Sequence, residues 1–313
     1  MKKFKIASGL FLIVFVILLG GFLSPNITHA EEKRIVTSFY PMYAITKEVI
    51  GDKHPVLMIN SANGIHGFEP SANDVKAIYE ADVFIYHSDI LESWAKKIKK
   101  NLEQNPSSSV VIIEASNGLA MEKVAGLENL ELMKGKNEET LYDPHTWLDP
   151  IELGNEAKLI ADALSQIDPS NKDYYQSQAK ELCQQAQALV DKYTPLFEKA
   201  TQKTFVTQHT AFSYLANRFG LTQLGIAGVS GQEPSVQQLQ AVKNFVDRYQ
   251  VTTIFTEPLI SDRAVQLIAD ETGANVLTLD PLEAAPQNNQ PFLVNLEANL
   301  KILSQVLNSK GEN

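Results

Sequence analysis

Three histidines stand in loops where an imidazole could bind a metal ion. His145 lies in the stretch DPHTWLDP, residues 143–150, between two Asp-Pro pairs. His66 follows a predicted strand in NGIHG, and His209 follows another in TFVTQHT. In an open parallel sheet, ligand groups gather beyond the carboxyl ends of the strands. We therefore expect His66 and His209, one from each half of the chain, to face each other across a cleft.

The residues around His145 favour a fixed imidazole. One proline stands directly before it and another five residues after it. Each proline fixes its own φ and keeps the preceding residue extended, so the ring loses little freedom when it binds a metal. Trp147 can form a wall of the site. Asp143 or Asp149 can accept a hydrogen bond from the ring nitrogen that does not bind the metal.

A fourth ligand is expected from the stretch LTLDPLEAAP near the end of the chain, which offers Asp280 and Glu283. Three imidazoles and one carboxylate suit Zn²⁺, whereas Mn²⁺ prefers more oxygen ligands. The single cysteine, Cys183, can form neither an internal disulfide nor a site of several thiolates. A metal site in this chain must therefore use His, Asp and Glu.

For the other three histidines we expect structural roles and not metal binding. His29 lies near the N-terminus, His54 in a polar turn and His87 at the end of a predicted strand, and we expect surface positions or packing for all three. Glu69 and Glu233 each begin a Glu-Pro-Ser triplet, and we expect them to support loops rather than to bind a metal directly.

Runs of β-branched residues alternate with helical patterns, which predicts an α/β fold with parallel sheets. Four predicted strands lie before residue 115 and four after residue 203. Their ranges are Arg34 to Ser38, Val56 to Asn60, Val83 to His87, Val110 to Glu114, Thr204 to Thr207, Leu224 to Val229, Thr252 to Thr256 and Asn275 to Leu279.

The two halves of the chain resemble each other. GFEPSANDVKAIYEADVFIYHS has a counterpart in GQEPSVQQLQAVKNFVDRYQVTTIFTEP, where Glu-Pro-Ser again opens a helix that leads into a strand. Ser71 with Asp74, and Ser235 with Gln238, have the spacing of a capping box. We infer an internal duplication and therefore two similar lobes, each a parallel-rich sheet with flanking helices.

One long helix is expected to join the lobes. Apolar residues recur at alternating steps of four and three, which predicts one buried face. That face consists of Tyr175, Ala179, Leu182, Ala186, Leu189, Tyr193 and Leu196. Pro195 is expected to bend or end the helix. The predicted organisation is an N-terminal lobe at 31–168, a linking helix at 169–200 and a C-terminal lobe at 201–313.

The first thirty residues have the pattern of a secretory signal peptide. Three lysines precede an apolar run, and Thr28-His29-Ala30 offers small residues before a cleavage point. We expect the rest of the chain to act outside the cytoplasm. No cysteine lies in residues 1–30 to carry a lipid, which leaves a soluble form and a signal-anchored form open.

The composition is that of a globular, acidic protein. The 313 residues are 44 % hydrophobic and 20 % charged, with a formal net charge of −10, and residues 1–30 contain basic but no acidic side chains. Such a surface repels phosphate backbones and mildly concentrates cations, so nucleic acid is not an expected partner. We expect a monomer.

These stretches resemble a known family. RIVTSFYPMYAIT, IHGFEPSANDVKAIYEADVFIYHSDILESWAKKI, DPHTWLDP, TFVTQHTAFSYLANRFGL, GVSGQEPSVQQL, IFTEPLIS and LDPLEAAP are similar to the zinc- and manganese-binding solute-binding proteins of ABC importers. The likeness runs from about residue 33 to 305 and is nearest to the laminin-binding, adhesin-type zinc members.

The resemblance implies two lobes joined by a long helix, with one metal ion in the cleft. Carried over by position, it implies His66, His145, His209 and Glu283 as ligands, while Asp280 stands where manganese members carry an aspartate. It also implies delivery of Zn²⁺ to a membrane permease with its ATPase, and no enzymatic activity. Many zinc members carry a histidine-rich loop before the second histidine, which this chain lacks.

Four other functions stay open at this point. The first is a zinc enzyme, because three histidines can also form a catalytic zinc site, although the chain has no H-E-x-x-H helix. The second is a manganese receptor of the same fold. The third is an adhesin that binds laminin-type matrix, and the fourth is a receptor for a metal chelate.

Overall fold

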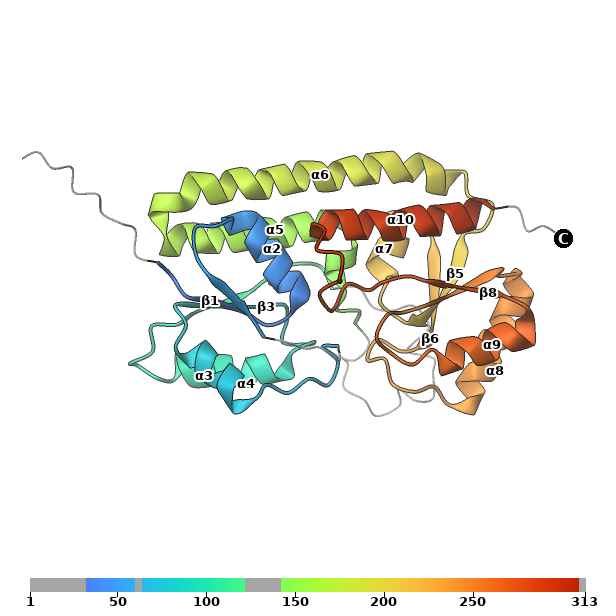
Figure 1. Cartoon of the computed structure of the whole chain (residues 1–313), viewed down its shortest axis with the longest axis horizontal. Coiled ribbons are helices and arrows are strands. Elements are labelled where there is room, and N and C mark those ends of the chain that lie inside the picture. Colours follow the sequence, from blue (N-terminus) through green and yellow to red (C-terminus); the bar gives the residue numbers. More distant parts are fainter. Residues whose placement is uncertain (1–31, 60–63, 122–141, 310–313) are drawn as a thin grey trace, which may run out of the picture. The chain divides into compact units, whose positions relative to one another are not determined.

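The computed structural model describes residues 32–59, 64–121 and 142–309, which contain two parallel β-sheets of four strands (Figure 1). The strand orders are β2-β1-β3-β4 and β6-β5-β7-β8. The strands are β1 (Ile35–Thr37), β2 (Val56–Met58), β3 (Val83–Tyr86), β4 (Val111–Glu114), β5 (Thr204–His209), β6 (Thr222–Ala227), β7 (Thr253–Thr256) and β8 (Asn275–Thr278). All eight predicted strands are present, with ends that differ by at most two residues. The predicted α/β fold class is confirmed.

Both sheets have the same arrangement of strands, in keeping with the inferred duplication. β1 lies between β2 and β3, and β5 lies between β6 and β7, all in parallel. The connection from β1 to β2 therefore runs to one side of the sheet and that from β3 to β4 to the other, and the second sheet repeats this divergence at β5 and β7. Beyond the carboxyl ends of such strands an open sheet has a crevice, and this is where the loops with the candidate ligands begin.

The helices cover both faces of each sheet. They are α2 (Tyr40–Ile50), α3 (Ala72–Tyr79), α4 (Ser93–Glu103), α5 (Pro150–Ile167), α6 (Lys172–Glu198), α7 (Ser213–Arg218), α8 (Val236–Tyr249), α9 (Arg263–Thr272) and α10 (Phe292–Asn308). Two short 3₁₀ turns, η4 (Thr146–Leu148) and η5 (Pro169–Asn171), precede α5 and α6.

Side chains of one strand alternate between two hydrophobic cores. In β3, Val83 and Ile85 belong to the large core that includes α2, α5 and α6. Phe84 and Tyr86 belong to a smaller core with α3 and α4. The second sheet shows the same alternation. Phe205 of β5 packs in the large core with α6 and α10, and Val206 packs in a third core with α8 and α9. This burial on both faces is typical of parallel sheets.

Both predicted capping boxes are present. The hydroxyl of Ser71 accepts a hydrogen bond from the backbone N–H of Asp74 at 3.3 Å, and the Asp74 carboxylate accepts one from the Ser71 N–H at 2.8 Å. Ser235 and Gln238 make the same pair of bonds at the start of α8. These bonds satisfy N–H groups that a helix leaves unpaired in its first turn, so the matched triplets fix where α3 and α8 begin.

The long helix α6 lies within the predicted range 169–200 and buries the predicted apolar face. The prediction is wrong at one residue of that face. Phe197 is fully buried, whereas Leu196 is 41 % exposed. The last step of the pattern is therefore four residues from Tyr193 and not three. α6 also continues past Pro195 to Glu198, so the proline lies in the last turn of the helix.

α5 lies beside α6 along much of its length (Figure 1). Gly154 allows the close approach, since the Cys183 Sγ donates a hydrogen bond to the Gly154 carbonyl at 3.2 Å. A Cβ at position 154 would lie 3.2 Å from that Sγ and 3.5 Å from the Cα of Cys183. A larger side chain there must push the two helices apart.

We expect Gly154→Val to lower the free energy of unfolding by about 1–3 kcal/mol, the usual effect of overpacking a buried contact. Chemical denaturation followed by circular dichroism measures the change. Lys158→Val, at an exposed position one turn further along α5, is the matched control and should change stability little. Equal effects of the two substitutions would show that the Gly154 contact is not tight.

Some predictions concern residues that the structure does not describe. The predicted signal peptide at 1–30 lies outside the described residues. So does most of the segment before His145, where other zinc members carry a histidine-rich loop. The lobe boundaries at 31–168, 169–200 and 201–313 stay predictions. Within the described residues, no helix combines the length and the apolar character needed to cross a membrane.

Candidate metal centre

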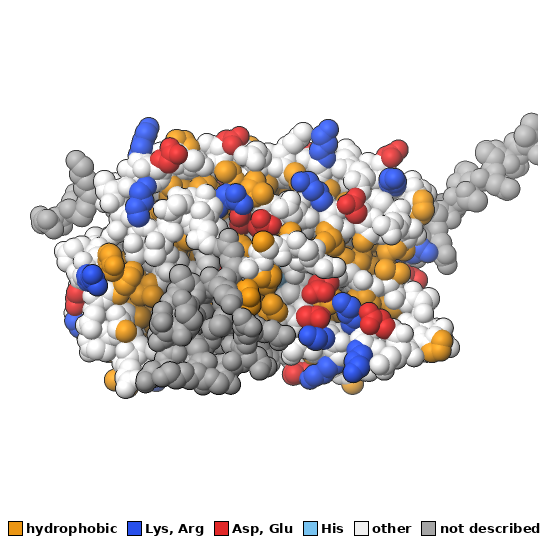
Figure 2. Space-filling view, turned by 180° about the vertical axis from the view of Figure 1, so that it is seen from behind, with side chains coloured by type: hydrophobic (Ala, Val, Ile, Leu, Met, Phe, Trp, Pro, Cys, Tyr) orange, Lys and Arg blue, Asp and Glu red, His pale blue; other side chains and the backbone are white. Residues whose placement is uncertain are grey.

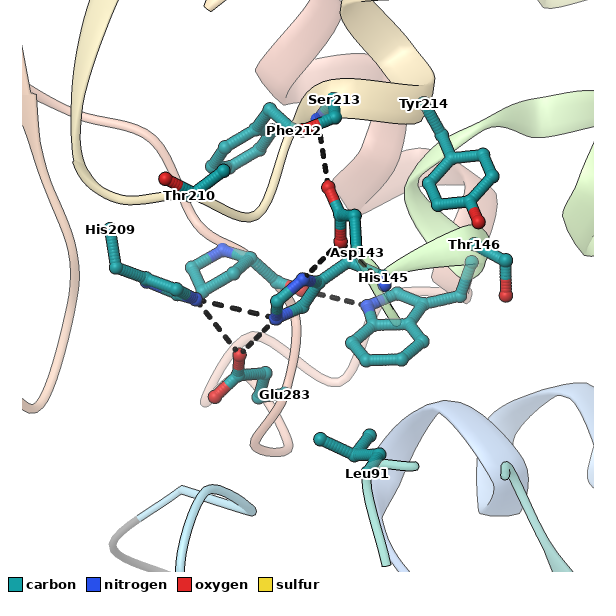
Figure 3. A network of polar contacts seen from close by, with 12 residues as sticks. Leu91, Asp143, His145, Thr146, His209, Thr210, Phe212, Ser213, Tyr214 and Glu283 are labelled. Atoms are coloured by element: carbon teal, nitrogen blue, oxygen red, sulfur yellow. Dashed lines mark hydrogen bonds and ion pairs between the residues drawn. The ribbon is translucent and has the colours of Figure 1, made fainter. Parts of the chain in front are cut away.

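Four side chains from four loops converge on one point. His66 follows β2, His145 directly precedes η4, His209 ends β5 and Glu283 follows β8. One donor atom from each lies within 4.8 Å of the others. Figure 3 shows the imidazoles of His145 and His209 directed toward the Glu283 carboxylate. The structure therefore brings together the three histidines and one of the two acids that the sequence singled out.

Five of the six separations among these donor atoms fit a tetrahedral metal ion. The Nε2 of His145 lies 3.1 Å from that of His66 and 3.3 Å from that of His209. The Glu283 Oε1 lies 3.1 Å from the Nε2 of His66, 3.1 Å from that of His145 and 3.3 Å from that of His209. In a tetrahedral zinc site with bonds of about 2.0–2.1 Å, ligand atoms are roughly 3.3 Å apart. These five separations match that value.

Asp143 fixes the ring of His145. Its Oδ1 accepts hydrogen bonds from the Nδ1 of the His145 ring at 2.6 Å and from the His145 backbone N–H at 2.8 Å. Its Oδ2 accepts another from the backbone N–H of Ser213 at 3.3 Å (Figure 3). Both Asp143 and His145 are completely buried. With the proton on Nδ1, the lone pair of His145 is on Nε2, where a metal can bind.

Glu257 does the same for His209, and the sequence reasoning missed it. Its Oε1 lies 2.6 Å from the His209 Nδ1 and accepts the His209 backbone N–H at 2.9 Å. Glu257 directly follows β7, the strand next to β5. An acid at the carboxyl end of a strand beside the one that ends in His209 was the signal that could have identified it.

His66 differs from the other two histidines. No described residue makes a hydrogen bond to its Nδ1, and its side chain is 17 % exposed. Glycines at 64 and 67 flank it, with φ values of 91° and 72°. A cavity of about 350 Å³ opens beside His66, His209 and Glu283. Glu257 and Asp280 also line this cavity, and its lining among the described residues includes no Lys or Arg.

The charges of the site are strongly coupled. Burial opposes the charged form of His209, but the carboxylates of Glu257 and Glu283 outweigh it and raise the pKa of His209 to about 10. Burial likewise opposes a charge on His145, yet Asp143 raises the pKa of this imidazole. Burial would raise the pKa of the Glu283 carboxyl, but the three histidines hold it well below its usual value. Without a metal, the raised pKa values of His145 and His209 favour protons on these imidazoles, which then pair with the Glu283 carboxylate.

His66 again behaves differently. Its burial outweighs the attraction of Glu283, so the pKa of His66 falls below its usual value. The centre without metal thus contains two imidazoles that favour the protonated form and one that favours the neutral form.

Asp280 lies outside the group of four donors. Its Oδ1 accepts a hydrogen bond from the backbone N–H of Leu282 at 2.8 Å. The side-chain amide of Asn299 on α10 makes two hydrogen bonds to the Asp280 backbone. It accepts one from the N–H at 3.0 Å and donates one to the carbonyl at 2.6 Å. Asp280 thus shapes the loop that carries Glu283.

Two further predicted neighbours of His145 have different contacts. Trp147 packs edge-on against the His145 ring, with 5.1 Å between centroids, and its Nε1 donates to the carbonyl of Pro281 at 2.9 Å. Asp149 does not contact the imidazole through any described hydrogen bond. It caps α5 by accepting the Ile151 N–H and pairs with Arg218 at 2.8 Å.

The remaining candidates lie elsewhere. His54 is buried and its Nε2 lies 2.8 Å from Asp168, while His87 is completely buried behind the His145 turn. Glu69 and Glu233 are exposed and outside the group of four donors.

The chain matches the family model of ZnuA, zinc-uptake complex component A, periplasmic, over residues 35–306. The chain belongs to this ZnuA family. The high-affinity zinc uptake system protein ZnuA of Bacillus subtilis (strain 168) is 36 % identical in an alignment 307 positions long that covers 92 % of each chain. The zinc-binding protein AdcA of Streptococcus pyogenes serotype M1 is longer, and this chain spans 62 % of its length.

Solved structures of two streptococcal proteins are similar to this chain. A Zn(II)-bound variant of AdcAII of Streptococcus pneumoniae is 55 % identical with a TM-score of 0.81, covering 88 % of this chain and 99 % of that one. Laminin-binding protein Lmb of Streptococcus agalactiae, described as a bifunctional protein with adhesin and metal transporting activity, is 51 % identical with a TM-score of 0.80, covering 88 % and 100 %. The resemblance noted in the sequence is confirmed.

Proposed function

We propose that this protein is an extracytoplasmic receptor that binds one Zn²⁺ through His66, His145, His209 and Glu283 and delivers it to an ABC importer. The observation that carries the proposal is the convergence of three Nε2 atoms on one carboxylate oxygen at 3.1–3.3 Å. Membership of the ZnuA family supports the same function.

Zinc is the favoured cargo because the donor set is rich in nitrogen. Mn²⁺ prefers more oxygen ligands, and Asp280, which could have supplied one, is bound to the backbone of its own loop. A negatively charged chelate is a poor candidate, since the cavity lining contains acids but no Lys or Arg among the described residues. The acidic lining favours a free cation.

A receptor is favoured over a hydrolase by the number of protein ligands. Catalytic zinc sites use three protein ligands and keep one position for water, whereas structural sites use four. On this proposal the four donors, which lie within 4.8 Å of one another, would fill all four positions of a tetrahedral site. Hydrolytic activity that disappears in His145→Ala would support the enzyme instead.

The partner on this proposal is a membrane permease with its ATPase, which the loaded protein meets as a monomer outside the cytoplasm. Nucleic acid is a poor partner for a chain of net charge −10. On the face in Figure 2, Lys and Arg are interspersed with Asp and Glu and form no broad basic area.

Binding of extracellular matrix is a second role, supported by the likeness to Lmb and to the laminin-binding protein Lbp of Streptococcus pyogenes. Saturable binding to immobilised laminin that does not depend on zinc would support it.

Metal analysis of the purified protein tests the main proposal. We expect one Zn²⁺ per chain, displaced poorly by excess Mn²⁺ in competitive titration. Growth of a deletion strain under zinc limitation, and its recovery with the intact gene, tests delivery to the importer. Absence of bound zinc after incubation with zinc would refute the receptor.

Zinc affinity should rise with pH from about 6.5 toward 10. The pKa of His209 is raised to about 10, so at neutral pH zinc must displace a proton from this imidazole, and that competition fades as pH approaches 10. The raised pKa of His145 acts in the same direction. The expected dependence is up to about two decades of affinity per pH unit. Titrations in chelator-buffered zinc between pH 6 and 8.5, with calorimetry in buffers of different ionisation enthalpy, measure the affinity and the released protons. A flat affinity above pH 7 would contradict these protonation states.

A further inference from the structure

Behind the turn that carries His145 lies a group of buried polar side chains that supplies none of the proposed ligands. His87 follows β3, Glu156 is on α5 and Thr146 begins η4. All three are completely buried. Because burying polar groups is costly unless they are hydrogen-bonded, their contacts need an explanation.

Polar contacts on both sides of the ring hold the His87 imidazole. The Thr146 hydroxyl donates to the Glu156 carboxylate and lies 2.7 Å from the His87 Nε2, which is also 3.4 Å from the same Glu156 oxygen. A hydroxyl has one proton, so Thr146 must accept its second bond from the Nε2–H of His87. On the other side of the ring, the Ser88 hydroxyl lies 3.1 Å from Nδ1 and already accepts the Leu91 N–H. In the neutral tautomer with the proton on Nε2, the Ser88 hydroxyl donates to Nδ1.

His87 is itself held firmly. The Glu92 carboxylate, at the start of α4, accepts the backbone N–H groups of His87 and Ser88 at 2.7 and 3.0 Å. Phe39 packs edge-on against the His87 ring. The imidazole thus has a fixed position relative to α4 and β3.

The same ring contacts both residues that follow His145. It binds Thr146 through the hydrogen bond, and it packs edge-on against Trp147 with 5.0 Å between centroids. Trp147 in turn packs against His145. Thr146 also closes the turn, because its N–H donates to the Pro144 carbonyl at 2.9 Å.

We propose that His87 is a positioning residue for the metal centre, which acts through Thr146 to fix the turn that aims the His145 imidazole. The inference rests on the proposed zinc-binding function. Asp143 holds the His145 ring and the His145 backbone N–H from one side. The next residue of the turn, Thr146, is held separately by His87 and Glu156.

A double-mutant cycle on zinc affinity tests the proposal. His87→Leu and Thr146→Val should each lower the affinity about tenfold, the lower end for losing an outer partner of a metal ligand. The double variant should lose no more zinc affinity than the single variant with the larger loss, because both substitutions remove the same interaction. His87→Gln keeps an N–H that can reach Thr146 and should recover most of the affinity.

A spectroscopic readout separates positioning from general stability. Co²⁺ bound in place of zinc reports ligand geometry through its visible absorption, and the bands should shift in His87→Leu and return in His87→Gln. Denaturation of the metal-free variants shows whether they fold. If His87→Leu does not fold, Thr146→Val and Glu156→Leu decide the question, since either removes a hydrogen bond of Thr146 and should weaken zinc binding and shift the Co²⁺ bands.

Two results would overturn the inference while leaving the receptor intact. One is wild-type zinc affinity and an unchanged Co²⁺ spectrum in the folded single variants. The other is an additive double variant, which would show that His87 does not act through Thr146. Failure of the wild-type protein to bind zinc would instead refute the proposed function itself.

Discussion

His145→Ala is expected to lower the affinity for Zn²⁺ by roughly a hundredfold or more. Four ligands share a binding free energy of about 10–16 kcal/mol in typical structural zinc sites, so one ligand contributes roughly 3 kcal/mol. The loss at this position should be large because Asp143 and the flanking prolines hold the ring in place before metal arrives. Competition with a chromophoric chelator measures the change.

His54→Ala is the matched control for the loss of a buried imidazole. His54 is 5 % exposed and its Nε2 pairs with Asp168, away from the metal centre. Its loss should reduce the stability of the fold and leave the zinc affinity of the folded protein unchanged. If both variants lost zinc affinity to the same extent, the effect of His145→Ala would reflect folding and not ligation.

Glu283→Gln is expected to weaken zinc binding by roughly a hundredfold, whereas Asp280→Asn should change it little. Both substitutions remove one charge and keep the shape of the side chain. Glu283 lies 3.1–3.3 Å from all three Nε2 atoms, and removing one partner of a buried charge pair costs about 3 kcal/mol or more. Asparagine at 280 can still accept the Leu282 N–H.

The same chelator competition compares the two variants, and it decides which acid is the fourth ligand. A larger loss in Asp280→Asn than in Glu283→Gln would assign the ligand to Asp280 and would favour a manganese-type site. Comparable losses in both would indicate that the two acids act together on the metal.

The sequence located the strands and the histidine loops because these follow from local patterns. Runs of β-branched residues with capped helices between them place every loop, and the parallel topology then brings the loops to one edge of each sheet. His66 and His209 could be chosen for this reason, and His145 for its position between two Asp-Pro pairs. Their distances could not, since they depend on how the two lobes pack.

The hydrogen-bond partners of the histidines, and the turn before Glu283, could not be predicted because they depend on tertiary structure. Asp143 and Asp149 are both near His145 in sequence, and only the fold turns the first toward the ring and the second toward Arg218. Leu282 has a φ of 55°, which few L-residues adopt, so the turn that presents Glu283 was not predictable. Glu257 is 48 residues from its partner His209.

Crystals of the zinc-loaded protein, with anomalous scattering recorded at the zinc absorption edge, test the account most directly. We predict one peak per chain, about 2.0–2.1 Å from the Nε2 atoms of His66, His145 and His209 and from a carboxylate oxygen of Glu283. A peak bound by Asp280 in place of Glu283, a peak elsewhere in the chain, or no peak at the centre would contradict it.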